Sequence, residues 1–281
     1  MKNTITFIQI FLLTLIFTSC SKDDDTSMPA DPLAAYHRIT SLEAGRYEVA
    51  IYGTDEALYT GYNELMIGVR DTETDELIEV SDLNWKPVMH MNAMMHSAPA
   101  SPLSPSAIEA VSTGYLIFQM PSNSEEYWEL KVDFTVAGTA YSVSGSLMVA
   151  SSERYAEVVS FMGNDENRYV LALKRPFEPE VATNDIGAYL YKMEDMMTFS
   201  PVTDLVIGID PRMPGMGNHS SPNNEDLLYD SIAGFYKGKL SLTMTGYWVV
   251  NLLITDGVNV IKGEEITEDN LQSNLYLEVE L

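Results

Sequence analysis

The chain carries an internal repeat, and this repeat constrains its fold more than any other feature. Four short motifs recur in the same order about 120 residues later in the chain. The matched pairs are Arg46-Tyr47 with Arg168-Tyr169, Asn63-Glu64-Leu65 with Asn184-Asp185-Ile186, Gly114-Tyr115 with Gly234-Phe235, and Tyr127-Trp128 with Tyr247-Trp248. Because copies of one structural unit at a fixed spacing produce such a pattern, we expect two homologous domains, at residues 36–155 and 156–281.

Both repeats predict β structure. Short segments rich in β-branched and aromatic residues alternate with turns that contain Gly, Pro, Asn and Asp. The Asp256-Gly257 pair predicts a hairpin. About seven short strands in each repeat predict an all-β fold of two tandem immunoglobulin-like β-sandwich domains, with Trp128 and Trp248 in their cores. The expected strands are 46–52, 64–70, 115–120, 128–136 and 141–149 in the first repeat, and 169–173, 186–191, 205–209, 236–244 and 248–254 in the second.

The first residues have the pattern of a signal peptide. Lys2 precedes an apolar stretch at 5–17, which is shorter than the roughly 20 residues that a membrane span needs. Small residues then lead directly to Cys20, and this arrangement resembles a bacterial lipobox. We therefore expect a signal peptide at 1–19, acylation of Cys20, and outer-membrane lipid as the partner of that cysteine.

The segment that follows Cys20 is polar and contains two prolines, so it predicts a flexible, lipidated linker at 20–35. The acidic run at 21–25 resembles the export signal of Bacteroidetes lipoproteins that reach the cell surface. The alternative is that this run is a solvated tether. The predicted location is the cell envelope, anchored to the outer membrane and facing either the periplasm or the outside.

Charge and cysteine content narrow the function. The chain has 41 acidic and 16 basic residues and a formal charge of −25, so phosphate backbones would be repelled and no nucleic acid is expected as a partner. Cys20 is the only cysteine, so the mature fold has no intramolecular disulfide. The sequence contains no His-Glu-x-x-His, Gly-x-Ser-x-Gly, P-loop or dinucleotide motif, and we expect no enzyme activity.

Two segments rich in Met and His lie at the same place in the two repeats, at 85–99 and 210–222. They hold three of the four histidines of the chain. Thioether sulfur is a soft ligand and imidazole a borderline one, and together they suit Cu(I) better than calcium, magnesium or zinc. A thioether binds without losing a proton, so such a site persists where thiols are oxidised. The segments therefore predict copper, as Cu(I), as the bound metal.

The candidate ligands follow from the spacing within each segment. In the second repeat, Met213, Met216 and His219 are expected on a loop that brings them around one ion, and Met244, just before Trp248, is the expected fourth ligand. In the first repeat the candidates are Met91, Met94, His96 and Met120, with Met89, His90 and Met95 as alternatives.

The same methionines have a metal-free interpretation, because Met often fills irregular cores or forms adaptable hydrophobic patches. Met193, Met196 and Met197 have no nearby His, and we expect them in the core or at the lip of the same patch. On this interpretation, two sandwiches on a tether form a surface interaction module that binds a protein or a glycan through its Met-rich loops.

The second repeat also resembles a known family. Its runs at 213–219 (Met-Pro-Gly-Met-Gly-Asn-His), 234–238 and 244–248 are similar to those of the YtkA-like family, which is related to FixH. The resemblance implies a β-sandwich of the bacterial envelope that handles copper, and copper-handling envelope proteins as partners. The first repeat matches less closely, since Asn92-Ala93 replaces Pro-Gly. The ligands implied by the resemblance are Met213, Met216, His219 and Met244.

Overall fold

The computed structural model describes residues 31–152, 156–175 and 177–281. Cys20, the predicted signal peptide and most of the predicted linker lie outside these ranges. Residues 33–281 form one compact unit. Within the described ranges, strands dominate, and no helix is both long and apolar enough to span a membrane.

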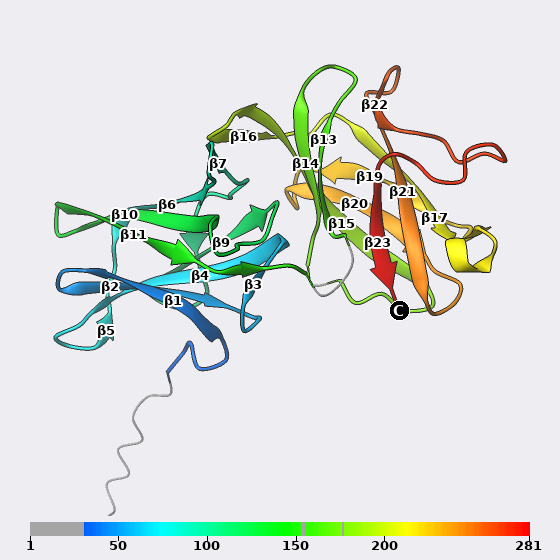
Figure 1. Cartoon of the computed structure of the whole chain (residues 1–281). Coiled ribbons are helices and arrows are strands. Elements are labelled where there is room, and N and C mark those ends of the chain that lie inside the picture. Colours follow the sequence, from blue (N-terminus) through cyan, green and yellow to red (C-terminus); the bar gives the residue numbers. More distant parts are fainter. Residues whose placement is uncertain (1–30, 153–155, 176) are drawn as a thin grey trace, which may run out of the picture. The chain divides into compact units, whose positions relative to one another are not determined.

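The residues up to 150, called the first half below, form two facing antiparallel sheets (Figure 1). One sheet has the strand order β1-β2-β4-β9-β8, and β5 pairs with β4; the other has the order β11-β10-β6-β7. A short parallel pair joins β3 to β12. The bounds are β1 His37–Ala44, β2 Tyr47–Gly53, β3 Leu58–Tyr59, β4 Gly61–Asp71, β5 Glu76–Leu77, β6 Ser81–His90, β7 Met95–Ser97, β8 Ser104–Pro105, β9 Val111–Phe118, β10 Tyr127–Val136, β11 Thr139–Leu147 and β12 Val149–Ala150.

The residues from 158 onward, called the second half, repeat this order. Strands β13-β14-β15-β20-β19 follow one another as β1-β2-β4-β9-β8 do, and β21 pairs with β17, which pairs with β18. Here β19 also pairs with β17, so the two layers join into one 11-stranded sheet. The bounds are β13 Val158–Met162, β14 Arg168–Leu173, β15 Thr183–Asp195, β16 Thr198–Pro201, β17 Val206–Met213, β18 His219–Ser220, β19 Glu225–Asp230, β20 Phe235–Ser241, β21 Tyr247–Thr255, β22 Val260–Gly263 and β23 Tyr276–Glu280.

This order of strands is that of an immunoglobulin-like sandwich. In the first half, β2-β4-β9-β8 take the places of strands A-B-E-D, and β11-β10-β6-β7 take those of G-F-C-C′. Trp85 on β6 is buried, as the tryptophan of strand C is in that fold. The all-β, immunoglobulin-like prediction is therefore confirmed. The described strand pairings all lie within 37–150 or within 158–280, while the division into two domains stays a prediction because 33–281 form one compact unit.

The sequence motifs of the repeat have matching structural roles. Asn63 accepts a hydrogen bond from the amide of Tyr59 at 3.0 Å and donates to the carbonyl of the same residue at 2.8 Å. Asn184 makes the same two bonds to Glu180, at 2.8 and 2.9 Å. Each asparagine thus closes the turn that leads into strand B of its half, β4 or β15. The two bonds are the same in both halves, so the shared asparagine has the same structural role in each.

Each half has its own hydrophobic core between its layers. Along β10, buried and more exposed residues alternate, as a strand with one core-facing side requires. Trp128 and Trp248 are fully buried at the centres of the two cores, as predicted. The hairpin predicted at Asp256-Gly257 is present, since it joins β21 to β22.

Candidate metal centre

A row of three side chains crosses the inner face of the second sheet in the first half. Met89 on β6 lies opposite Trp128 on β10 and, on its other side, opposite His96 on β7. Directly opposed residues of antiparallel strands point to the same face, so all three side chains face the core. We call Trp128–Met89–His96 the inner row of the first half. Met89 is 0% exposed, and the His96 ring stands edge-on to the Trp128 ring at 5.4 Å and 89°.

The imidazole of His96 is oriented by its own strand. Its Nδ1 lies 2.8 Å from the carbonyl oxygen of Ser97, a geometry in which Nδ1–H donates and Nε2 keeps its lone pair. The Ser97 hydroxyl in turn donates to the carbonyl of Pro87 at 2.7 Å, which fastens β7 to β6. A histidine that ligates a metal through one nitrogen usually has its other N–H held in this way.

A second methionine approaches the same tryptophan from the loop before β10. The indole Nε1–H of Trp128 donates to the carbonyl of Met120 at 2.9 Å, and Met120 packs half-buried against the core. The backbone bond holds Met120 beside the inner row. Met89, Met120 and His96 thus all lie close to Trp128, Met120 through its backbone carbonyl.

The second half contains the same constellation. Met213 lies opposite His219 across β17 and β18, and the β17–β21 register, continued by one residue, sets Met213 opposite Trp248. We call Trp248–Met213–His219 the inner row of the second half. Met213 is 4% exposed, and the rings of His219 and Trp248 lie 6.4 Å apart. The Trp248 Nε1–H donates to the carbonyl of Met244 at 3.1 Å, as its counterpart does to Met120.

A glycine in the loop after Met244 leaves room for the side chain of Met213. Gly246 has a φ of +122°, which an L side chain rarely adopts, and a Cβ there would lie 3.2 Å from the terminal methyl of Met213. His219 is more exposed than His96, and its Nε2 lies 3.4 Å from the hydroxyl of Thr243. The second site is therefore the more open of the two.

The structure brings together some of the predicted ligands and separates others from them. Met213, His219 and Met244 gather at Trp248, and His96 and Met120 gather at Trp128. Met216 is 60% exposed in a 3-10 turn at Pro214–Met216. In the first half, Met94 is 53% exposed at the β6–β7 turn, and Met91 packs half-buried against the core.

Met89, one of the alternatives in the sequence, is the structural counterpart of Met213. The expected match with Met91 and Met94 rested on loop spacing alone. However, 85–90 belongs to strand β6, and Met213 is the last residue of β17 rather than part of a loop. Proline has no backbone N–H to donate to a neighbouring strand. Pro87 and Pro211 fit their strands because each lies one residue beyond the last pair that β6 forms with β7 or β17 forms with β18. The register that sets Met89 opposite Trp128 is visible only in the structure, so the sequence gives Met89 no more than the place of an alternative.

Harder metals have no comparable site in the described ranges. No group of three or more His, Cys, Asp or Glu side chains is placed there to hold an ion. The inner rows are built from thioether and imidazole, and their donor chemistry fits a soft monovalent ion.

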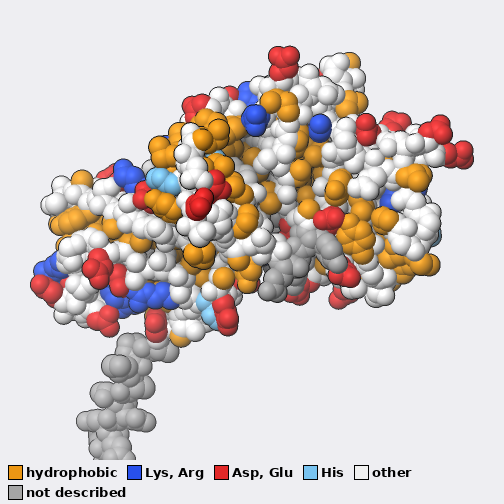
Figure 2. Space-filling model, viewed as in Figure 1, with side chains coloured by type: hydrophobic (Ala, Val, Ile, Leu, Met, Phe, Trp, Pro, Cys, Tyr) orange, Lys and Arg blue, Asp and Glu red, His pale blue; other side chains and the backbone are white. Residues whose placement is uncertain are grey.

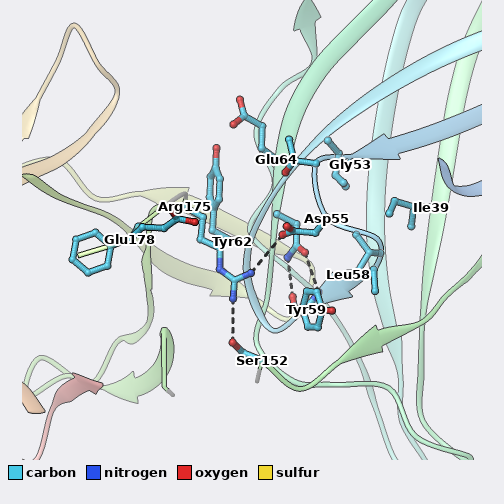
Figure 3. A pocket seen from close by; sticks show the side chains of 15 residues that line it. Ile39, Gly53, Asp55, Leu58, Tyr59, Tyr62, Glu64, Ser152, Arg175 and Glu178 are labelled. Atoms are coloured by element: carbon cyan, nitrogen blue, oxygen red, sulfur yellow. Dashed lines mark hydrogen bonds and ion pairs between the residues drawn. The ribbon is translucent and has the colours of Figure 1, made fainter. Parts of the chain in front are cut away.

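A cavity of about 420 Å³ lies elsewhere, where the two halves meet (Figure 3). Its guanidinium group, from Arg175, lies 3.0 Å from the Ser152 hydroxyl, 3.7 Å from Asp55 and in contact with buried Glu157. None of the described residues that line it is a Met, Cys or His. The charge of Arg175 is neutralised by carboxylates. The cavity is therefore a polar contact region between the two halves rather than a metal site.

Tyrosines from both halves extend this contact region. The Tyr115 and Tyr191 hydroxyls lie 2.6 Å apart, and the rings of Tyr62 and Tyr189 stack at 5.4 Å. Burial is the main cause that raises the pKa of Tyr189 to about 12. These phenols stay neutral at any physiological pH, so they contribute packing and hydrogen bonds rather than charge.

Comparison with known proteins adds little to this description. No family model matches the chain, and no curated protein matches it. The FdeC adhesin of Escherichia coli, a solved structure, is similar over 86% of this chain and 65% of that chain, with 13% identity and a TM-score of 0.25. The chain thus spans less than two thirds of the adhesin chain. The YtkA-like resemblance stays a prediction.

Proposed function

We propose that this protein captures Cu(I) at the two inner rows and serves copper trafficking or tolerance in the cell envelope. The observation that carries the proposal is the repetition of one constellation. In each half, a Met–His pair lies across two strands beside a buried Trp whose indole N–H bonds the carbonyl of a further Met. Core packing accounts for buried methionines, but it does not account for a histidine at the same position in both halves.

The chemistry of the side chains supports a soft cation. Thioether sulfur and imidazole nitrogen are neutral donors, so a monovalent ion is bound without assembling several carboxylates. The face of an indole attracts a cation within about 6 Å, and each inner row includes one. The formal charge of −25 adds a long-range attraction for cations.

Anaerobic competition between the protein and a Cu(I) chelator tests the proposal. We use the Cys20→Ser form of the full chain, because the thiol would otherwise bind Cu(I) itself. Each inner row is expected to hold one Cu(I) ion against the chelator. Replacing Met89 by Leu and His96 by Phe should remove one of them, and Met213→Leu with His219→Phe the other. Leu keeps the volume of Met, and Phe keeps a ring beside the Trp, so the variants remove donors while preserving the packing.

The matched control replaces exposed methionines that lie outside both rows. Met148 is 73% exposed and Met162 is 45% exposed. Met148→Leu with Met162→Leu should leave both Cu(I) ions bound. If the row variants and this control retain equal amounts of Cu(I), the inner rows are not the sites.

The cellular setting belongs to the same proposal. The lipobox-like sequence at Cys20 supports an outer-membrane lipid anchor, with copper-handling envelope proteins as donors or acceptors. Radiolabelled palmitate should label the wild-type chain in cells and leave Cys20→Ser unlabelled. Equal labelling of both would remove the anchor from the proposal.

One observation favours a second candidate, the metal-free interaction module. Met94, Met95 and Met196 are 53%, 53% and 40% exposed, which makes an adaptable apolar patch. A module of this kind would bind a protein or a glycan equally well with and without Cu(I). Loss of partner binding in Met94→Ser with Met95→Ser, together with no Cu(I) binding by the wild type, would favour it over copper capture.

A further inference from the structure

A second row of side chains crosses the outer face of the same sheet in the first half. His90 on β6 lies opposite Tyr127 on β10 and opposite Met95 on β7. These residues are the direct chain neighbours of the inner row. Because successive side chains of a strand alternate between faces, they point away from the core. We call Tyr127–His90–Met95 the outer row.

His90 is held in place while one of its nitrogens lacks a partner. Its ring stacks on Tyr127 with centroids 4.9 Å apart and planes 6° apart. Its Nε2 is shielded from solvent and has no hydrogen-bond partner among the described residues. The nearest carboxylate oxygen, from Glu129, is 3.8 Å from Nε2, too far for a hydrogen bond. Shielded polar atoms nearly always have a partner, so this nitrogen needs an explanation.

Two methionines lie near this position, one on β7 and one on the turn beside it. Met95 is the cross-strand partner of His90, and such partners have Cβ atoms about 5 Å apart. The turn between β15 and β16 sets the backbone of Met196 beside β7, because the amide of Ser97 donates to the carbonyl of Met196 at 2.8 Å. β7 and β16 lie side by side in Figure 1, and hydrophobic side chains gather over them in Figure 2.

We infer that His90, Met95 and Met196 form a third site for a soft monovalent cation of the Cu(I) class, on the outer face of the sheet. The donors are one shielded imidazole nitrogen and two exposed thioethers, the same set as in the inner rows. An ion bound to His90 Nε2 supplies the missing partner. A patch built only for apolar contact explains Met95 and Met196 but leaves the shielded nitrogen unpaired.

The second half has no equivalent of this site. Counted by the same register, Tyr247, Pro214 and Asn218 take the places of Tyr127, His90 and Met95. Neither Pro214 nor Asn218 offers a soft donor. The outer site is thus a property of the first half, and we expect a stoichiometry of three soft cations per chain rather than two.

This inference does not depend on the inner rows, and one titration separates the two. The Cys20→Ser form of the full chain, labelled with ¹³C at the methionine methyl groups, is titrated with silver nitrate in chloride-free buffer. Ag(I) is a diamagnetic, redox-inert probe for Cu(I). The methyl signals of Met95 and Met196 are expected to shift together, and His90→Phe should abolish both shifts while keeping the ring stacked on Tyr127.

The methyl groups that shift distinguish the outer site from the inner ones. Shifts confined to Met89, Met120, Met213 and Met244 would overturn the outer site and leave the proposed function standing. Shifts of Met95 and Met196 alone would support the outer site and remove the inner ones. If exposed Met148 shifts at the same Ag(I) concentration as Met95, or if His90→Phe leaves the Met95 shift unchanged, binding is nonspecific and the outer site does not exist.

Discussion

The two halves share an inner row and differ in the outer one. Trp128–Met89–His96 and Trp248–Met213–His219 use the same residue types at the same places in the fold. On the opposite face, the first half has His90 and Met95 where the second half has Pro214 and Asn218. The inner positions must satisfy the core as well as any ligand, whereas the outer ones face few packing demands. The halves therefore provide an internal control for separating packing from metal chemistry.

The largest expected effect is on folding. Trp128→Ala and Trp248→Ala each remove a fully buried indole and its hydrogen bond to a Met carbonyl. Each should lower the free energy of unfolding by about 3–5 kcal/mol in urea denaturation. The equivalence of the halves predicts losses of similar size. A loss below about 1 kcal/mol in one half alone would show that its Trp is not a core residue.

The next effect separates donors from packing. Met89→Leu and Met213→Leu should each weaken Cu(I) binding in their own half at least tenfold. Since Leu and Met have similar volumes, the free energy of unfolding should fall by less than about 1.5 kcal/mol. Chelator competition and urea denaturation on the same samples check both parts. Unchanged affinity with unchanged stability would make these methionines core residues only.

A smaller effect tests two ligands that the spacing predicts and that the structure leaves exposed. Met216 is 60% exposed in its turn, away from the Met213–His219 pair, and Met94 is 53% exposed in the other half. Met216→Leu and Met94→Leu should each change Cu(I) affinity less than threefold and unfolding by no more than about 0.5 kcal/mol. A tenfold loss with Met216→Leu would instead place Met216 among the ligands, through a movement of its turn.

The smallest effect concerns acid. The Lys237 ammonium and the amides of Ile232 and Ala233 hydrogen-bond the Asp230 carboxylate and lower its pKa to about 2. A lowered pKa in the folded state stabilises the protein above the ordinary Asp value of 3.8, and this contribution is lost as the pH falls towards 2. The turn before β9 in the first half uses Ser106 instead, whose hydroxyl accepts from the Ile108 amide at 3.0 Å and does not titrate.

NMR titration of the Asp230 carboxyl carbon should give a midpoint near pH 2, and Asp230→Ser should remove that acid dependence from the second half only. A midpoint near 4 would show that the Lys237 contact does not form.

The sequence predicts the fold well because the repeat and the strand patterns are local. The expected strands at 128–136 and 248–254 fall within β10 and β21, and the matched Asn63 and Asn184 make matching turns. What the sequence does not show is the register between strands. Met89 is seven residues before His96 in the chain, yet they are cross-strand partners. Only the pairing of β6 with both β7 and β10 sets Met89, rather than Met91 or Met94, beside Trp128.

The sequence does not predict the outer row for a related reason. The spacing of the Met–His segment offers His90 and Met95 only as alternatives for the inner site, because the face of each side chain depends on the strands β6 and β7. Local sequence patterns cannot predict that Met196 lies near Ser97, because the two residues are 99 positions apart in the chain. Long-range contacts of this kind depend on how the halves pack.

X-ray absorption at the copper edge, on the Cys20→Ser, His90→Phe chain loaded anaerobically with two Cu(I) ions, tests the central claim most directly. The account predicts that copper is bonded to both sulfur and imidazole nitrogen, and that the number of sulfur atoms per copper falls in the combined Met89→Leu, Met213→Leu variant, in which Met120 and Met244 remain. Copper bonded only to nitrogen or oxygen atoms, or an unchanged number of sulfur atoms per copper in this variant, would contradict it.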